Sequence, residues 1–127
     1  MPGKHLFEYA VIRVVPRVER EEFINVGIVL FCKQQRYLQT RFHLDRERLL
    51  ALCPKLDIDE VQNYLHAFEK ISRGAADGGP ISKLDIPFRF RWLTATRSTV
   101  VQTSAVHPGL CLNAPETLER LFNQLVK

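Results

Sequence analysis

The polar residues with the greatest capacity for chemistry gather in residues 13–27 of the 127-residue chain. Arginines and glutamates crowd this segment, and an asparagine and a glycine follow them. A guanidinium offers a planar fork of N–H donors that suits a carboxylate or a phosphate, so such a segment could hold an anion. The candidate binding residues of this segment are Arg13, Arg17, Glu22 and Asn25.

Arg13 is the one polar residue on an otherwise aromatic and aliphatic strand face. A partly buried arginine in such a place usually forms an ion pair. The favoured interpretation is therefore an ion pair between Arg13 and Glu22. Asn25 would then cap a turn, and Gly27 would permit close approach of a neighbouring backbone. The alternative is that the cluster stays open and binds an anionic ligand, because loops at the end of a rigid sheet often carry binding sites.

A second polar cluster flanks the β-branched residues 99–106, and its candidate binding residues are Arg97, Ser98, Gln102 and His107. If residues 99–106 form a strand, Arg97 and His107 mark its opposite ends and cannot share one small ligand without help from another loop. Ser98 has neither an acidic partner nor the glycine pattern of a nucleophile elbow nearby. The sequence therefore does not support acyl-transfer chemistry.

Aromatic residues alternate with arginines in residues 86–93, IPFRFRWL. Such a segment could stack nucleobases while its arginines neutralise phosphates. The same alternation is typical of an ordinary half-buried strand, and this interpretation is preferred. The aromatic side chains would then close the core, and Arg89 and Arg91 would face water.

Motifs for a metal or a cofactor are incomplete. His107 with Cys111, and His43 with Asp45, each lack further ligands, and no C-x-x-C or H-E-x-x-H spacing occurs. The glycine-rich residues 74–80 lack the Lys-Ser/Thr pair that completes a phosphate-binding loop. We therefore expect no metal, no cofactor and no catalytic set.

Composition and charge indicate an ordinary globular protein. Hydrophobic residues make up 46% of the chain and charged residues 25%, and the length suits one domain, residues 1–127. A net charge of +4 permits an anionic partner, but the chain has none of the Lys/Arg runs of dedicated nucleic-acid domains. Neither a membrane-spanning run nor a signal peptide is evident, and the three cysteines are widely spaced. We expect a cytoplasmic protein with reduced thiols.

Three strands are predicted to position the first cluster. Residues 6–15 are apolar on both faces, which indicates a central strand. Residues 26–32 are the most hydrophobic stretch, and residues 37–44 alternate between apolar and polar. Together they predict an antiparallel meander, with a helical turn in the charged connection at residues 17–25.

Capping residues mark the predicted helices. Asp45 begins a short helix, and Asp57 begins the longest one, which Gly74 ends. Asn113 begins the last helix. The expected fold is α+β, with an antiparallel or mixed sheet of four or five strands and the two main helices on one face. A flexible glycine-rich loop is expected at residues 74–80.

Three segments together resemble a known bacterial family: YAVIRVVPRVEREEFINVGIVLFC, YLQTRFHLDRERLLALCP and WLTATRSTVVQTSAVHPG. On these segments the chain is identified as a member of the family catalogued as domain of unknown function 3037. The resemblance covers nearly the whole chain and implies no established activity. It implies a neighbouring gene for a kinase-like protein that resembles the HipA toxins. It also implies that both polar clusters recur among relatives, at Arg13, Pro16, Arg17, Glu22, Asn25, Gly27, Arg97, Ser98, Gln102 and His107.

Three functional hypotheses follow. The favoured one is a non-catalytic accessory or interaction domain whose partner is the HipA-like kinase. In the second, the chain binds nucleic acid or a nucleotide in a salt-sensitive manner, through Arg13, Arg17, Arg89, Arg91 and Arg97. In the third, the chain is an enzyme that acts on a phosphorylated substrate, with Glu22 or His107 as general base. That version requires both residues to lie near one pocket.

Overall fold

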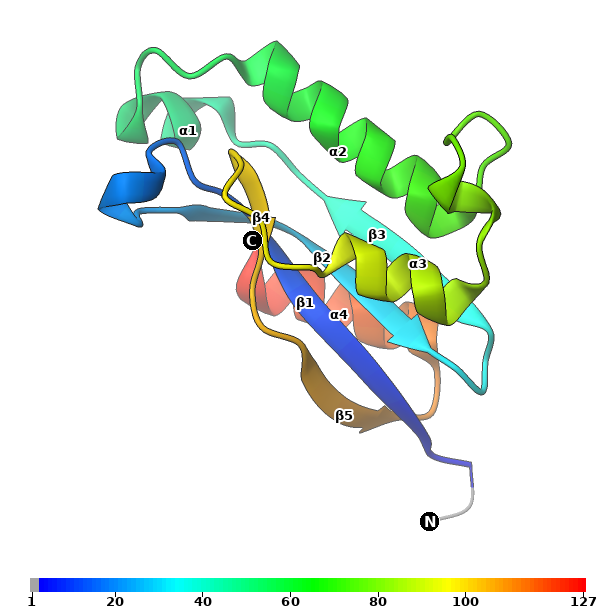
Figure 1. Cartoon of the computed structure of the whole chain (residues 1–127). Coiled ribbons are helices and arrows are strands. Elements are labelled where there is room, and N and C mark those ends of the chain that lie inside the picture. The colour runs from blue at the N-terminus through cyan, green and yellow to red at the C-terminus, as the bar shows by residue number, and fades with distance from the viewer. Residues whose placement is uncertain (1–2) are drawn as a thin grey trace.

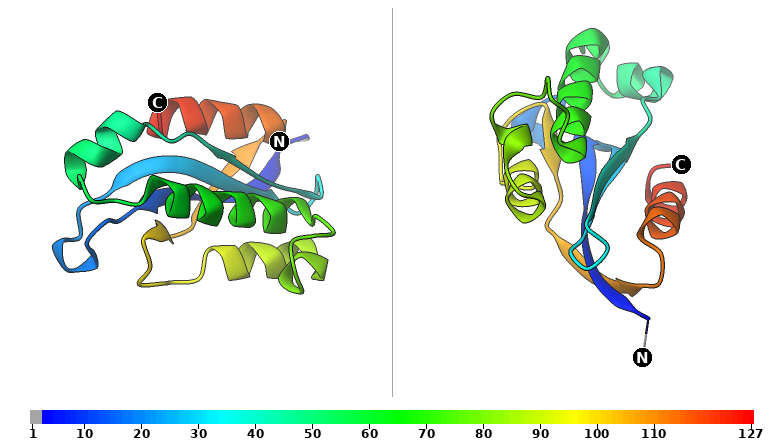
Figure 2. Two further views of the ribbon diagram at one scale, coloured as in Figure 1. Left: turned by 90° about the horizontal axis from the view of Figure 1, so that it is seen from above. Right: turned by 90° about the vertical axis from the view of Figure 1, so that its right-hand side faces the viewer.

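The computed structural model describes residues 3–127, in which a five-stranded antiparallel sheet lies between helices on its two faces (Figures 1 and 2). The strand order is β3-β2-β1-β4, and β5 pairs with β1 further along the same edge. The α+β class and the opening meander are thereby confirmed. The elements are β1 (His5–Val14), a 3-10 turn (Val18–Arg20), β2 (Ile24–Cys32), β3 (Tyr37–Phe42), α1 (Arg46–Leu52), α2 (Ile58–Arg73), a second 3-10 turn (Ile81–Lys83), α3 (Ile86–Leu93), β4 (Val101–Thr103), β5 (His107–Cys111) and α4 (Ala114–Leu125).

The central strand β1 is buried on both faces because each face receives a helix layer. Ala10, Ile12 and Val14 belong to the core beneath α2 and α3, whereas Phe7 and Val11 belong to the core beneath α4. The two main helices thus lie on opposite faces of the sheet, where we expected both on one face (Figure 2). An apolar stripe shows that a helix packs on a sheet but does not specify which face it reaches.

Side-chain caps begin the helices where the sequence predicts. The carboxylates of Asp45 and Asp57 accept hydrogen bonds from backbone N–H groups at 3.1 Å, and Asn113 does so at 3.0 Å. Gly74 ends α2 in the left-handed conformation, with φ of 69°. These contacts confirm the predicted caps. Such caps can be predicted from sequence because they depend only on residues within one turn.

Residues 86–93 form the helix α3, so the strand predicted there is wrong. The segment contains a helical stripe as well as an alternation: Ile86, Phe90 and Leu93 are spaced at i, i+4 and i+7 and pack into the core. Pro87 lies in the first turn, where its missing N–H costs nothing. Residues 86–93 fit both a helical spacing and a period-two spacing of apolar residues, and they adopt the helix.

Of the strand predicted over residues 99–106, only β4 (Val101–Thr103) forms, and a further strand, β5, begins at His107. Both strands pair with β1. Ser104 lies between them and makes the bonds to β1 itself. Its hydroxyl accepts from the backbone N–H of Val11, and its backbone N–H donates to the Val11 carbonyl, both at 2.8 Å.

Gly27 lies beside a β-bulge, and its lack of a side chain lets β3 approach. A Cβ atom at this position would lie 2.7 Å from the carbonyl oxygen of Arg41, which confirms the predicted close approach. The register shifts here, so that Ile12 pairs with Gly27 while Arg13 pairs with Asn25. The bulge therefore fixes which residue of β2 lies beside Arg13.

Candidate functional site

Arg13 lies at the centre of the candidate site because β1 has a paired strand on each side of it. Its partner across β2 is Asn25, and its partner across β4 is Gln102. Side chains directly opposite one another in antiparallel strands point to the same face. Residues from both predicted clusters are thus brought side by side.

The Arg13 guanidinium stacks on the ring of Phe23, 4.0 Å from the ring centroid, and has no carboxylate partner among the described ion pairs. Its Nε is buried and lacks a hydrogen-bond partner in the part of the chain that the structure describes. The ion pair predicted between Arg13 and Glu22 is therefore wrong. Glu22 instead pairs with Arg20, whose hydrogen bond lowers the pKa of the Glu22 carboxyl.

Asn25 ties the sheet to the end of α4. Its side-chain amide donates a hydrogen bond of 3.1 Å to the carbonyl of Leu125. Its Oδ1 is buried and without a partner within residues 3–127. Asn25 therefore has a structural role in place of the predicted turn cap.

Arg97 closes the end of α3. Its guanidinium donates to the carbonyl of Leu93 at 3.1 Å and also to the carbonyl of Trp92, and it lies over the indole ring, 4.3 Å from the centroid. Partial burial lowers the pKa of Arg97, but a guanidinium remains charged at physiological pH. Arg97 is thus a positive charge that carbonyl oxygens and an aromatic ring stabilise, and it forms none of the described ion pairs.

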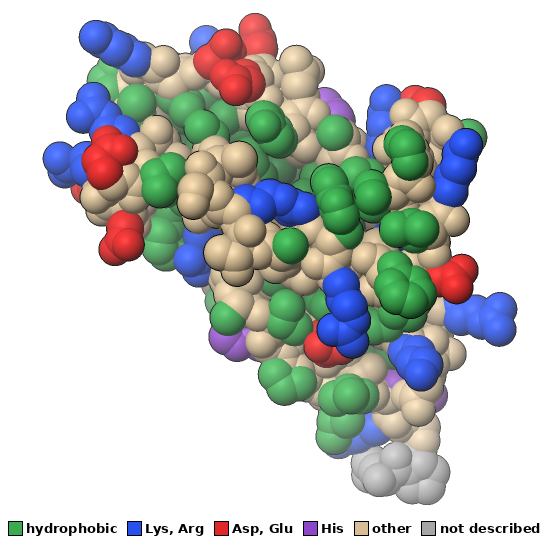
Figure 3. Space-filling model, in the orientation of Figure 1, with side chains coloured by type: hydrophobic (Ala, Val, Ile, Leu, Met, Phe, Trp, Pro, Cys, Tyr) green, Lys and Arg blue, Asp and Glu red, His purple; other side chains and the backbone are tan. Residues whose placement is uncertain are grey.

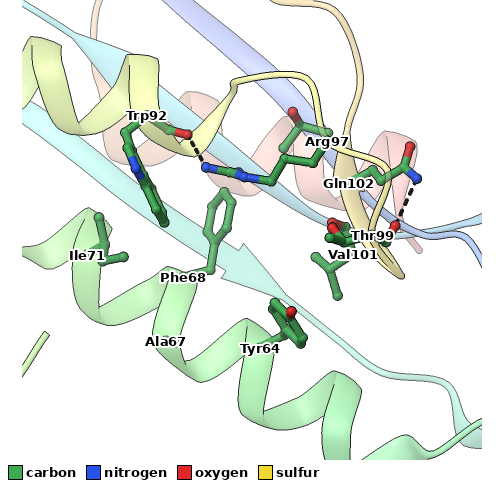
Figure 4. A pocket seen from close by; sticks show the side chains of 10 residues that line it. Tyr64, Ala67, Phe68, Ile71, Trp92, Arg97, Thr99, Val101 and Gln102 are labelled. Atoms are coloured by element: carbon green, nitrogen blue, oxygen red, sulfur yellow. Dashed lines mark hydrogen bonds between the residues drawn. The ribbon is translucent and has the colours of Figure 1, made fainter. Parts of the chain in front are cut away.

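Two adjoining hollows meet at Arg97 and Gln102. The first, called here the aromatic cleft, has a volume of about 270 Å³ and lies between α2, α3 and β4 (Figure 4). Its lining includes Tyr64, Phe68 and Trp92. The second, called here the arginine hollow, has a volume of about 450 Å³ and is lined by residues that include Arg13, Glu21, Phe23, Arg97, Ser98 and Gln102.

The remaining predicted site residues lie elsewhere. Arg17 and Glu22 line a separate hollow beside Cys53. His107 begins β5, where it pairs with Tyr9 and places its ring 5.4 Å from the tyrosine ring. The structure therefore brings together Arg13, Arg97, Ser98 and Gln102, but neither Arg17, Glu22 nor His107.

Comparison with known families agrees with the motifs read from the sequence. The family model described as protein of unknown function (DUF3037) matches residues 9–126. The chain belongs to this family. No curated protein and no solved structure matches it. The matched residues of this DUF3037 member include both polar clusters and both hollows.

Arg89 does not belong to any binding surface. It is only 8% exposed, and its guanidinium donates to the carbonyls of Ile71 and Ser72 at 3.2 and 3.3 Å. These carbonyls end α2, where a positive charge is favourable. The prediction that Arg89 faces water is wrong, and the five arginines of the second hypothesis do not form one surface.

The aromatic lining of the cleft was missed in the sequence. Tyr64 lies outside the apolar stripe of α2, which Val61, Leu65 and Phe68 form, and is 47% exposed. A large aromatic residue off the stripe of an amphipathic helix was the available signal.

Neither a metal site nor a membrane span is found in residues 3–127. No three His, Cys, Asp or Glu side chains there are arranged to hold a metal ion. No helix there is long and apolar enough to cross a bilayer.

Proposed function

We propose that this DUF3037 protein is a non-catalytic interaction domain that docks a protein partner through α3. The docking face consists of Phe88, Arg91 and Trp92 on α3, with Tyr64 of α2 beside them. The observation that carries the proposal is the exposure of two large aromatic side chains one helical turn apart: Phe88 is 61% exposed and Trp92 41%.

The polarity of α3 is unusual for a helix on the surface of a monomer. Such a helix normally buries its aromatic side chains and exposes its charges. Here Arg89 is buried while Phe88 and Trp92 face outwards. Figure 3 shows hydrophobic side chains gathered over α3 with Lys and Arg side chains among them. Trp, Tyr and Arg are the residues that most often dominate binding energy at interfaces.

The proposed partner is a HipA-like kinase, because the family resemblance suggests a nearby gene for such a protein. An apolar groove on the partner would receive the exposed aromatic side chains. An acidic rim around that groove would complement Arg91 and the net charge of +4 of the whole chain. The kinase would supply the catalysis, and the chain would restrain or position it.

The positions of Glu22 and His107 favour this proposal over the enzymatic one. Glu22 lies two residues before Ile24, which pairs with Val14, whereas His107 pairs with Tyr9. Five residues along a strand span roughly 17 Å. Glu22 and His107 therefore do not lie near one pocket, which the enzymatic hypothesis requires.

Co-expression of the chain with the neighbouring HipA-like kinase tests the proposal. We expect the two proteins to co-purify and to elute together in size-exclusion chromatography, with a stoichiometric ratio by light scattering. Phe88→Ala should weaken the complex at least about tenfold, whereas Leu112→Ala should retain it, since Leu112 is also exposed (65%) but lies between β5 and α4, outside the docking face. Absence of a complex, or a complex that tolerates Phe88→Ala, would contradict the proposal.

A further inference from the structure

The two adjoining hollows combine a flat apolar compartment with a cationic one, and docking through α3 does not account for that combination. We propose that they form a binding site for a nucleotide. The base would lie in the aromatic cleft, and the phosphate would lie in the arginine hollow. Arg97 and Gln102, which line both hollows, would contact the ligand at the junction.

The cationic compartment holds two guanidinium groups that have no carboxylate partner among residues 3–127. Arg13 stacks on Phe23, and its buried Nε has no partner among the described residues. Arg97 donates to two carbonyls in the part of the chain that the structure describes. Glu21 also lines the hollow but forms none of the described ion pairs. Two positive charges in one concavity suit a dianionic phosphate, which accepts hydrogen bonds from both forks.

The exposed Ser98 adds a hydroxyl to this compartment. A serine hydroxyl can donate to a phosphate oxygen that the guanidinium groups leave free. The arginine hollow therefore offers both guanidinium and hydroxyl donors.

The apolar compartment has aromatic walls and little room. Tyr64, Phe68 and Trp92 line it, and its volume of about 270 Å³ lies near the lower end of the roughly 300–1,000 Å³ typical of small-molecule sites. Figure 4 shows Arg97 reaching towards Trp92, above Phe68. One ring system would fit between aromatic walls, where stacking tolerates any base.

Polar groups at the rim could read the edge of a base. Thr99, Gln102 and Thr103 contribute to the lining of the aromatic cleft. The Gln102 amide donates to the carbonyl of Thr99 at 2.8 Å, which leaves its side-chain oxygen as an acceptor. An acidic peptide would match the arginines but would make no use of the flat compartment.

A free nucleotide and a nucleotide within a single strand present the same chemistry to this site. The chain has one tryptophan, Trp92, so its intrinsic fluorescence reports directly on the aromatic cleft. The probes are the 5′-monophosphates of adenosine, guanosine, cytidine and uridine, with the four unphosphorylated nucleosides and inorganic phosphate as half-ligands. An oligothymidylate of about ten nucleotides represents single strands.

We expect at least one monophosphate to quench Trp92 saturably with a Kd below about 1 mM. Its unphosphorylated nucleoside and inorganic phosphate should each bind about tenfold more weakly, because each fills one compartment only. If the oligonucleotide binds more tightly, with a steeper salt dependence, single strands are the source of the ligand; if it does not, free nucleotides are.

Substitutions in the arginine hollow test whether the nucleotide binds there. Arg97→Gln and Ser98→Asp should each weaken binding by about tenfold, the first by removing a donor fork and the second by placing a carboxylate in the arginine hollow. Ser98 is exposed, so Ser98→Asp keeps the test valid if Arg97→Gln disturbs folding. Arg120→Gln on α4 is the matched control and should bind as the unmodified chain does. The proposal is overturned if none of the probes binds, if both variants bind normally, or if only an acidic peptide such as oligoglutamate quenches Trp92.

Discussion

The guanidinium of Arg97 covers the indole ring of Trp92 at 4.3 Å and also donates a hydrogen bond to the carbonyl of the same residue. One side chain therefore closes the C-terminal end of α3 and holds the segment that leads to β4 against it. The same contact orients Trp92, which belongs both to the docking face and to the aromatic cleft. The position of Arg97 thus links the two proposed activities.

Arg97→Lys should destabilise the chain by about 1 kcal/mol, because an ammonium group cannot stack flat on the indole while donating to two carbonyls. The emission maximum of Trp92 should shift as the ring becomes more hydrated. Urea unfolding followed by fluorescence measures both effects. Arg91→Lys, an exposed change on the same helix, is the control and should leave both quantities unaltered. An equal change in the two variants would refute the role given to Arg97.

Arg89→Ala should lower the free energy of unfolding by roughly 2–4 kcal/mol, because it removes a buried side chain and leaves the Ile71 and Ser72 carbonyls without their donor. Thermal unfolding compared with Arg120→Ala, an exposed helix position, gives the measurement. The control should lie within about 0.5 kcal/mol of the unmodified chain. A loss for Arg89→Ala as small as that of the control would show that Arg89 does not hold the end of α2.

Asn113→Ala should lower the free energy of unfolding by about 1 kcal/mol, since the Asn113 side chain caps α4 through the N–H of Glu116. Asn63→Ala in the exposed part of α2 changes the same residue type without a cap and should have little effect. Chemical denaturation of both variants measures the two free energies of unfolding. Equal stabilities would contradict the capping role.

Stability should fall at alkaline pH because burial raises the pKa of the Cys111 thiol above its ordinary value of 9.0. The folded state then retains a proton that the unfolded state loses. The contribution of Cys111 to the free energy of unfolding is fully present below pH 9, the pKa of the thiol in the unfolded chain. It is lost as the pH rises through the pKa of the thiol in the folded chain. Urea unfolding between pH 7.5 and about 10 should show a smaller decline in Cys111→Ala than in the unmodified chain. If the free energy of unfolding declines equally in both proteins, Cys111 does not contribute to the loss of stability at alkaline pH.

Local features of the fold were predictable because they depend on neighbouring residues. The caps at Asp45, Asp57 and Asn113 and the alternation of the first three strands all follow from residues within a turn or along one strand. α3 was not predictable in the same way. Residues 86–93 satisfy both a period of two and a helical stripe, and only packing against α2 selects the helix.

The candidate site was predictable by residue type but not by arrangement. Arg13 and Gln102 become neighbours through β1–β4 pairing between segments far apart in the sequence. The partner of Glu22 is Arg20, two residues before it in the same connection, whereas Arg13 stacks on Phe23. The aromatic cleft was missed, since its walls come from two helices whose packing no local pattern specifies.

The affinity of this protein for its proposed partner, the HipA-like kinase that the family resemblance implies, tests the central claim most directly when it is measured by calorimetry with purified proteins. Submicromolar binding is the expected result. It should be weakened at least about tenfold by Phe88→Ala and left unchanged by Leu112→Ala. Undetectable binding, or equal affinity for the two variants, would contradict the claim that α3 docks a partner.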